Sequence, residues 1–379
     1  ALNETSNNLI ISSHLFPSSE ELDELMTILN LPLPDQKELK NLIKKIAINT
    51  NSNLEEQDLN ELSIASSGLT EIKVKQVTAK ALAQRGKISK EDIKDILEEK
   101  KQVIARSEIL EFFEAKSSQD DIGGLNVLKV WLNQRYRAFS KEARDYGLPI
   151  PKGVLLVGAQ GTGKSLTAKS ISKSWSMPLL RLDVGRLFSS LVGSSEARTR
   201  ETISRAEAMS PCILWIDEID KGFGGDARSD GGTSQRVLAS LLTWMAEKES
   251  AVFVIATANA IDKLPAELLR KGRFDEIFFL DLPNSEERLS ILDLHLKKRR
   301  PSYSFPLSTI IDRTDGFSGA ELEQAVIEGM HISFSENREL MEKDLIKAVS
   351  ELVPLSRTAK EQIDFLKEWS STGRARSAS

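Results

Sequence analysis

The residues of this chain that are best suited to chemistry begin with a glycine-rich stretch, GAQGTGKS, at Gly158–Ser165. Its spacing matches G-x-x-x-x-G-K-[ST], in which backbone N–H groups surround phosphate oxygens, the lysine reaches the β- and γ-phosphates, and the final hydroxyl binds Mg²⁺. Lys164 and Ser165 hold those two positions. The alternative interpretation is an ordinary glycine-rich turn. Because an apolar stretch, GVLLV, precedes the loop and a helical pattern, SLTAKSISKSW, follows it, we expect a nucleotide site.

Acidic residues follow a second apolar stretch, CILWIDEID, at Cys212–Asp220. At the carboxyl end of a parallel strand, Asp217 would hold Mg²⁺ through water, and Glu218 would polarise the water that attacks the γ-phosphate. Acidic strand ends are common and are usually only solvated. The nearby phosphate loop is what makes this pattern indicate hydrolysis.

Two further polar residues are candidates for the same reaction. Asn259 ends the next apolar stretch, in the segment IATAN, and would orient the attacking water, although Asn after a strand is more often a turn residue. Arg273, in RKGRFDE, lies on a loop far along the chain and would enter the site of a neighbouring subunit as an arginine finger. Its alternative is a surface ion pair, for instance with Asp275.

The composition of the chain excludes several other kinds of protein. Its 379 residues suffice for two or three domains, and a net charge of −5 opposes a broad electrostatic contact with nucleic acid. Three histidines and one cysteine supply neither a zinc cluster nor an internal disulfide. No apolar run is long enough to span a membrane, and no secretion signal begins the sequence. We therefore expect a cytoplasmic protein without a transmembrane segment or a nucleic-acid partner.

Alternating apolar and helical patterns must position the candidate residues. The stretches GVLLVG, PLLRLDV, CILWIDE, AVFVIAT and EIFFLDL, with helical patterns between them, predict an α/β fold whose parallel sheet is covered by helices on both faces. From about Ser285 the pattern is helical only, which predicts a smaller α-helical domain.

An internal repeat predicts that the chain contains part of one module twice. The sequence from Asn7 parallels the sequence from Ala251, and Gly68 then stands opposite Gly316. The first copy has Leu15 where the second has Asn259, and it lacks the LLRKGRFD segment. We therefore expect a partial, degenerate module at residues 1–110, a linker-like stretch at 114–121, a complete large domain at 111–284, and a helical domain with a C-terminal tail at 285–379.

Six segments occur in the order seen in the AAA family of P-loop ATPases: DIGGL, KGVLLVGAQGTGKS, ILWIDEID, ATAN, GRFD and DGFSGAEL. They cover about residues 118–350, and the chain resembles that family, in particular the AAA proteins of cyanobacteria and algal chloroplast genomes. The resemblance implies a P-loop sheet domain with a helical lid, ATP and Mg²⁺ as ligands, and a location in the chloroplast stroma if the protein is plastid-encoded.

The resemblance also assigns roles to individual residues. It places nucleotide between the large domain and the lid, with Asp217 and Ser165 at the metal and with Glu218, Asn259 and Arg273 in hydrolysis. The residues implied to contact the nucleotide are Ile122, Gly123, Gly158, Ala159, Gln160, Gly161, Thr162, Gly163, Lys164, Ser165, Leu166, Gly319 and Ala320.

Members of the family usually form hexameric rings that pull polypeptides through a central pore. This implies a homo-oligomer that remodels a protein client. Two departures support a different reading: Leu191 replaces the aromatic residue of the pore loop, and Glu276 replaces the second arginine of G-R-F-D-R. The alternative is a nucleotide-gated switch that binds partners without threading them. A third reading, a nucleic-acid remodeller, rests only on the basic run HLKKRRPSY at His295–Tyr303.

Overall fold

The computed structural model describes residues 33–105, 109–113, 122–188, 194–223 and 233–379. Residues 34–379 form one unit, and the description below concerns that unit alone. Several expectations fall outside the described residues: the first strand of the degenerate copy with Leu15, the linker at 114–121, and Leu191 in the expected pore loop. Within the described ranges, no helix combines the length and the apolar character that crossing a membrane requires.

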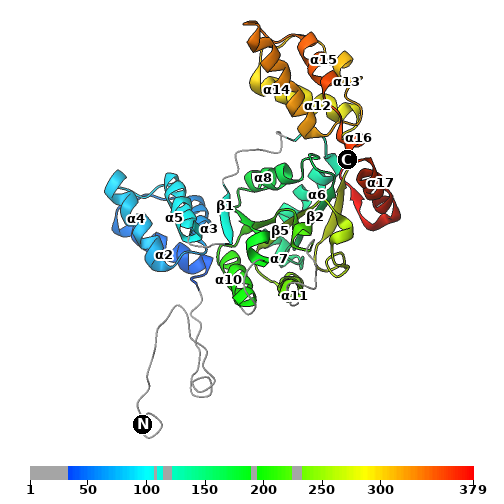
Figure 1. Ribbon diagram of the computed structural model, residues 1–379. Helices are drawn as coiled ribbons and strands as arrows, with labels where there is room; N and C mark the ends of the chain where they lie inside the picture. Colours follow the sequence, from blue (N-terminus) through cyan, green and yellow to red (C-terminus); the bar gives the residue numbers. More distant parts are fainter. Residues whose placement is uncertain (1–32, 106–108, 114–121, 189–193, 224–232) are drawn as a thin grey trace, which may run out of the picture. The chain divides into compact units, whose positions relative to one another are not determined.

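A seven-stranded sheet with the order β1-β3-β4-β5-β2-β6-β7 forms the centre of the fold (Figure 1). Only the β1–β3 pair is antiparallel. The five expected apolar stretches are strands, and most of their residues are buried on both sides, as a sheet covered on two faces requires. The strands are β1 (Leu110–Phe113), β2 (Gly153–Gly158), β3 (Leu179–Leu182), β4 (Cys212–Ile216), β5 (Val252–Ala258), β6 (Glu276–Leu280) and β7 (Arg376–Ser377).

Helices cover the two faces of this sheet with separate hydrophobic clusters. One cluster packs α6 (Asn126–Arg137) and α8 (Lys164–Ser174) against Val154, Trp215 and Phe253. The other packs α10 (Ser194–Ala208) and α11 (Thr233–Glu247) against the opposite side chains of the same strands (Figure 1). The short α7 (Lys141–Asp145) and α9 (Val184–Phe188) lie in the connections. The α/β prediction is therefore confirmed.

Two strands were not expected from the sequence. β1 begins at Leu110, inside the segment assigned to the first module, and its four residues are too few to display a strand period. β7 contradicts the expectation of helices only after Ser285, because the chain returns to the sheet edge beside β6. Its two residues, Arg376 and Ser377, carry no apolar pattern that could have revealed them.

The helices that follow β6, called the lid below, have a hydrophobic core of their own. The lid helices are α12 (Ser285–Arg299), α13 (Ser308–Ile311), α14 (Gly319–Ser335) and α15 (Glu342–Glu351), and Leu292, Leu322 and Leu345 are among the residues that they bury together. A short α16 (Leu355–Thr358) follows, and then α17 (Lys360–Trp369). Two side chains of α17, Leu366 and Trp369, belong to a core cluster of the sheet domain.

Residues 36–105 form four further helices with a core of their own. These are α2 (Gln36–Asn49), α3 (Glu56–Ser66), α4 (Glu71–Arg85) and α5 (Ile93–Ala105), which bury Leu39, Leu62 and Val74. A short 3-10 turn, η2 (Lys90–Asp92), precedes α5. The segment contacts the sheet domain where Gly68 lies against the backbone of Ala208, which leaves no space for a Cβ atom.

The four N-terminal helices and the four lid helices share the same local structures. A capping box begins the first helix of each set, at Asp35–Glu38 and at Asn284–Glu287. A glycine with positive φ precedes each third helix, Gly68 at 84° and Gly316 at 75°, and a hydroxyl then caps it.

Near the start of the fourth helix of each set lies a buried aspartate that pairs with an arginine. Asp92 is 1% exposed and pairs with Arg85, and Asp344 is 2% exposed and takes two hydrogen bonds of 2.6 Å from Arg338. The guanidinium of Arg338 lowers the pKa of Asp344. The order of elements, the caps and this ion pair are thus alike in the two sets.

Candidate active site

The glycine-rich stretch forms a loop between β2 and α8. Gly161 and Gly163 have φ values of 80° and 93°, which residues with a side chain rarely adopt, and the space beside Gly163 is open. α8 begins at Lys164, so the unpaired N–H groups of its first turn and its positive end face this loop. The loop therefore has the backbone geometry of an anion cradle.

Lys164 is only 6% exposed at the centre of the loop. Its Nζ atom donates to the carbonyl oxygens of Gly158 at 2.8 Å and Ala159 at 2.6 Å. Burial lowers the pKa of Lys164 to about 8, while nearby carboxylates oppose that shift. A phosphate placed in the loop would supply the negative charge that this buried ammonium lacks.

Three hydroxyl and carboxylate groups join α8 to the ends of β4 and β5. The Oδ1 atom of Asp217 accepts from the Ser165 hydroxyl at 3.1 Å and from the Thr257 hydroxyl at 2.8 Å. The Thr257 oxygen in turn accepts from the backbone N–H of Glu218 at 2.8 Å. Glu218 has a φ of 50°, unusual for a residue with a side chain, and this hydrogen bond helps to hold it there.

The carboxylate of Glu218 lies beside Asn259. The Nδ2 atom of Asn259 donates to Glu218 Oε1 at 3.0 Å, and Lys221 Nζ lies 2.5 Å from Oε2. Asp220, on the 3-10 helix η4 (Ile219–Phe223), accepts from the backbone N–H groups of Asn259 at 3.2 Å and Ala260 at 3.1 Å. The two strand ends are therefore linked through both backbone and side chains.

A cavity of about 390 Å³ opens above this network. Its lining includes most of the residues that the sequence singled out, drawn from the P-loop, two strand ends, the segment before α6 and the start of α14. These are Ile122, Gly123, Gln160, Gly161, Thr162, Gly163, Lys164, Ser165, Leu166, Asp217, Glu218, Asn259, Gly319 and Ala320. Gly158 and Ala159 do not line it, but their carbonyl oxygens hold Lys164.

The lid closes on the P-loop at close range. The N–H of Ala320 donates to the carbonyl oxygen of Gly161 at 3.2 Å, and a Cβ atom on Gly161 would lie 2.8 Å from Ser318 Oγ. Gly123 similarly faces Ile291 of α12, with no space for a side chain. The glycines at these positions let large domain and lid meet around the cavity.

The sequence reasoning missed the residues of α12 that line the cavity, Glu287, Ile291, Leu294 and His295, together with Glu323 of α14. His295 belongs to the basic run considered for nucleic-acid binding. Arg299 Nη1 lies 3.2 Å from His295 Nδ1, and Arg299 also pairs with Glu323. Burial lowers the pKa of His295. Its spacing of four residues from Ile291 was the available signal, because it places both on one face of a helix.

Arg273 does not lie in this cavity. It lies near the amino-terminal ends of the parallel strands, at the other end from the P-loop. There Asp275 Oδ2 accepts from the N–H groups of Lys152 at 2.8 Å and Gly153 at 3.1 Å. Asp275 is thus occupied in fixing the start of β2, and no ion pair of Arg273 is found among the described residues. Glu276 begins β6 at the same end of the strands, opposite Val154.

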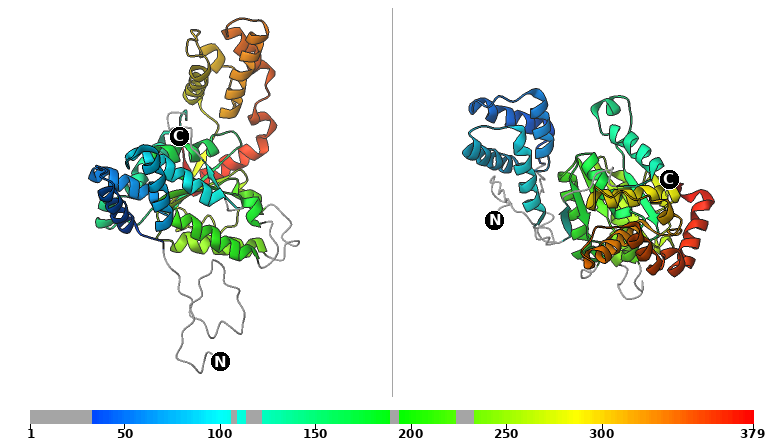
Figure 2. Two further views of the ribbon diagram at one scale, coloured as in Figure 1. Left: turned by 90° about the vertical axis from the view of Figure 1, so that its left-hand side faces the viewer. Right: turned by 90° about the horizontal axis from the view of Figure 1, so that it is seen from above.

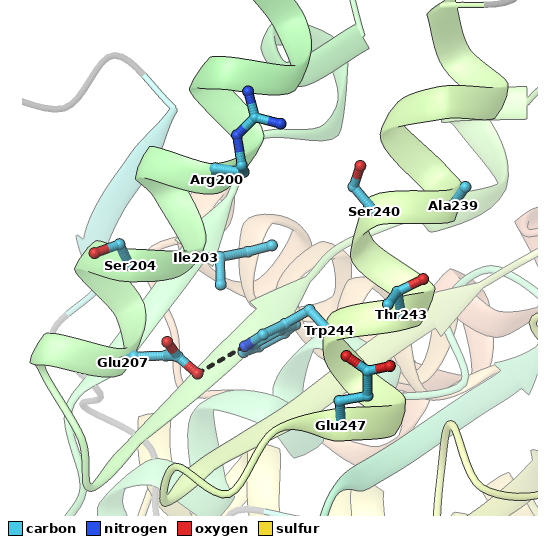
Figure 3. Close-up of a pocket in the computed structure, with 9 residues that line it drawn as sticks. All are labelled: Arg200, Ile203, Ser204, Glu207, Ala239, Ser240, Thr243, Trp244 and Glu247. Atoms are coloured by element: carbon cyan, nitrogen blue, oxygen red, sulfur yellow. Dashed lines mark hydrogen bonds between the residues drawn. The ribbon is translucent and has the colours of Figure 1, made fainter. Parts of the chain in front are cut away.

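A second hollow, of about 560 Å³, lies between α10 and α11 (Figure 3). Trp244 donates from Nε1 to Glu207 at 2.9 Å across it, and the Ser250 hydroxyl donates to the same carboxylate oxygen at 3.0 Å. The nine residues that line it include no histidine, cysteine or lysine. The groups suited to phosphate chemistry are therefore gathered in the first cavity.

Fold, phosphate loop and strand-end acids together define a P-loop ATPase of the AAA class, and comparison with known proteins agrees. Residues 154–282 match the model of the AAA family, "ATPase family associated with various cellular activities", and residues 37–107 match "SpoVK-like AAA ATPase, second domain". The chain belongs to the AAA family, whose domain is an ATP-binding and ATP-hydrolysing one.

Its relatives include proteins of algal chloroplast genomes. The "Uncharacterized AAA domain-containing protein ycf46" of Pyropia yezoensis is 48% identical over 377 residues, which cover 99% of this chain and 77% of that protein. The protein of the same name from Guillardia theta is 49% identical over 381 residues, or 100% of this chain and 75% of that one. The "ATP-dependent zinc metalloprotease FtsH" of Cyanidium caldarium is 36% identical over 243 residues, or 62% of this chain and 39% of that protein.

Proposed function

We propose that the protein binds ATP with Mg²⁺ in this cavity and hydrolyses it. The observation that carries the proposal is the continuous network from Ser165 through Asp217, Thr257 and Glu218 to Asn259 at the mouth of the P-loop. It brings a metal-type oxygen pair, a carboxylate base and an amide donor to one place. These are the groups that phosphoryl transfer to water requires beside a phosphate cradle.

The oxygen groups present fit Mg²⁺ as a cofactor shared with the nucleotide. Ser165 Oγ and Asp217 Oδ1 are hard oxygen ligands 3.1 Å apart. Among the described residues there is no group of three His, Cys, Asp or Glu side chains placed to hold an ion. Mg²⁺ bound with few protein ligands relies on phosphate oxygens and water, and when bound it neutralises charge on the phosphates.

In this proposal different residues of the chain bind the phosphates, activate the water and enclose the adenine. The N–H groups of residues 159–166 and the Lys164 ammonium bind the phosphates. Glu218 orients and polarises the attacking water, and Asn259 holds Glu218 in place. The adenine of the nucleotide is enclosed by Ile122, Gly123, Gly319 and Ala320, together with the α12 residues of the cavity.

We further propose that Arg273 completes the site of a neighbouring copy in a homo-oligomeric ring, which is hexameric in the family. Its loop is fixed to the start of β2, whereas the P-loop follows the end of that strand. Five steps of about 3.3 Å separate the two ends, or about 16 Å, which an arginine side chain does not span. Arg273 therefore cannot serve its own site, and a heterologous ring contact is the arrangement that supplies it to another.

The proposed use of hydrolysis is to remodel a protein client. The second candidate, a nucleotide-gated switch, is favoured by Glu276, whose acid lies at the same sheet edge as Arg273 and would weaken catalysis between subunits. Nucleic-acid remodelling is not proposed, because Lys297 and Arg299 of the basic run pair with Asp293 and Glu323.

We also propose that the chain consists of a degenerate partial module at 1–110, a large domain at 111–284 and a lid with a tail at 285–379. The shared caps and Arg–Asp pairs of the two helical sets support this division, as does the match of residues 37–107 to an AAA-related domain. The chloroplast-genome relatives support a location in the stroma.

Glu218→Gln tests the hydrolysis proposal directly. The variant keeps the size of the side chain and can still accept from Asn259, but it loses the charge that polarises water. We expect ATP to bind within about threefold of wild type while turnover falls by about 10²-fold or more. ATP turnover measured with purified protein at saturating Mg²⁺, beside binding of a fluorescent ATP analogue, separates the two effects. Unchanged turnover would remove Glu218 from the role of base.

A further inference from the structure

The chain beyond the lid returns to the nucleotide-binding domain. We call residues Lys360–Ser379, which comprise α17 and β7, the C-terminal return. Figure 2 shows α17, in red, beside the sheet domain, and its Leu366 and Trp369 are buried in a core cluster of that domain. Ala378, just after β7, is 1% exposed, donates to the Phe279 carbonyl at 3.0 Å and accepts from the Leu128 N–H at 3.1 Å. The segment is therefore anchored at both of its ends.

Three polar side chains of this segment contact residues that line the cavity. Gln362 Nε2 donates to the backbone carbonyl oxygen of Asn259 at 3.1 Å. Lys367 Nζ lies 3.3 Å from Asp281, and Ser379 donates from Oγ to Glu287 at 2.6 Å. Asn259, Asp281 and Glu287 all line the cavity, although no residue of the C-terminal return does. The segment thus supports the site from outside.

The contact with Asn259 bears most directly on hydrolysis, because the Asn259 side chain donates to Glu218, the proposed catalytic base. Its N–H is held by Asp220, its side-chain amide donates to Glu218, and its carbonyl is held by Gln362. With the backbone fixed on both sides, the amide group has little freedom to rotate away from the carboxylate. Removing one anchor leaves Asp220 as the single side-chain contact to that backbone.

We propose that Gln362 is a positioning residue for ATP hydrolysis, which acts by holding the Asn259 backbone so that the Asn259 amide stays on Glu218. The inference rests on the proposed hydrolytic function and extends it to a residue outside the cavity. It also connects the lid to the reaction. α16 and α17 follow the lid directly, and the Leu355 N–H donates to Glu321 of α14 at 2.7 Å.

Gln362→Glu is the sharpest test, because it keeps the shape and replaces the donating NH₂ by an oxygen that faces another oxygen. The lost hydrogen bond is exposed, so we expect kcat to fall by about twofold to tenfold. KM and the Kd for an ATP analogue should stay within twofold, since Gln362 does not line the cavity. Gln362→Lys retains a donor and should keep kcat near wild type. Glu361→Gln, an acid–amide exchange at the adjacent exposed position, is the matched control and should change neither constant.

A second readout does not depend on turnover. Amide hydrogen exchange of the full chain reports on the N–H groups of Asn259 and Ala260, which Asp220 holds. Gln362→Glu should raise exchange in this segment and leave β4 and the thermal midpoint unchanged. If wild type does not hydrolyse ATP, the functional proposal fails and exchange alone decides the structural one. Unchanged exchange overturns the inference, and so does an unchanged kcat or a fall in kcat matched by an equal loss of ATP affinity.

Discussion

Mixing two inactive variants tests whether Arg273 acts between subunits. Arg273→Ala removes the finger and leaves the P-loop site intact, whereas Glu218→Gln removes the base and leaves the finger intact. Because Arg273 is fixed about 16 Å from its own P-loop by the length of β2, its loss cannot alter the site of the same chain directly. A finger that reaches a neighbouring site is worth about 10³-fold or more in kcat, so each variant alone should be nearly inactive.

The mixture should recover activity, because an Arg273→Ala chain, whose own site is intact, can stand next to a Glu218→Gln chain that supplies Arg273 to that site. In a ring assembled at random from equal amounts, half of the chains have an intact base and half of their neighbours supply Arg273, so about a quarter of wild-type turnover per chain is expected. The assay is steady-state ATP turnover after the variants are mixed under conditions that let rings exchange subunits, with assembly followed by light scattering. Specific activity of wild type should also rise with protein concentration.

A different result would refute the reasoning. If assembled mixtures show no more activity than the separate variants, Arg273 does not complete a neighbouring site. Wild-type activity that is flat with concentration and indifferent to Arg273→Ala would mean that each chain works alone. Such a result would favour the nucleotide-gated switch over a ring motor.

Two further predictions concern charge at the site. ATP affinity should be constant below about pH 7 and fall by about tenfold per pH unit above pH 8. The reason is that burial lowers the pKa of the free Lys164 to about 8 and phosphate binds its protonated form, so the protonated fraction is lost as pH rises. Titration of a fluorescent ATP analogue between pH 6.5 and 9.5 measures this, with Lys164→Arg as a control that stays charged; an affinity independent of pH up to 9.5 contradicts it. Glu276→Arg should raise turnover by up to about tenfold, because it replaces a negative charge near Arg273 by a positive one. A fall in turnover with assembly intact would show that Glu276 contributes positively.

The candidate phosphate-binding and hydrolytic residues could be picked out from the sequence because each group of them lies in one short stretch of the chain. The P-loop and the acids after β4 are contiguous motifs, and parallel strands bring their carboxyl ends to one edge. At the end of the cavity that we propose for the adenine, the resemblance supplied Ile122, Gly123, Gly319 and Ala320, but the α12 side chains and Glu323 could not be found in this way. His295 and Glu323 come from two lid helices whose closure depends on tertiary packing, and β1 and β7 are too short for a hydrophobic period to reveal them.

Asp220 shows a second kind of contact that the sequence alone does not reveal. Its position after the two catalytic candidates was visible, but its function as an acceptor for the Asn259 and Ala260 N–H groups depends on how η4 turns after β4. The contact from Gln362 is harder still, because 103 residues separate it from Asn259 along the chain. Sequence patterns therefore predict the candidate reacting groups here, and the structure adds the residues that support them.

The N-terminal helices share the caps and the Arg–Asp pair of the lid helices, but not the small residues that begin α14. When Gly68 is set opposite Gly316, Glu71 and Ile72 stand where the lid has Gly319 and Ala320. In the lid, the N–H of Ala320 reaches the Gly161 carbonyl at 3.2 Å, and a Cβ atom on Gly319 would already lie 3.4 Å from that oxygen, so residues with larger side chains would crowd this approach. The Ile72 side chain instead lies 68% exposed. A pair like that of Arg85 with the buried Asp92, by contrast, is present in both sets, and removing Arg85 would leave the Asp92 carboxylate without this charge partner. Caps and an Arg–Asp pair shared with the lid, without its small residues, support the proposal that residues 1–110 are a degenerate module that packs but does not bind ATP.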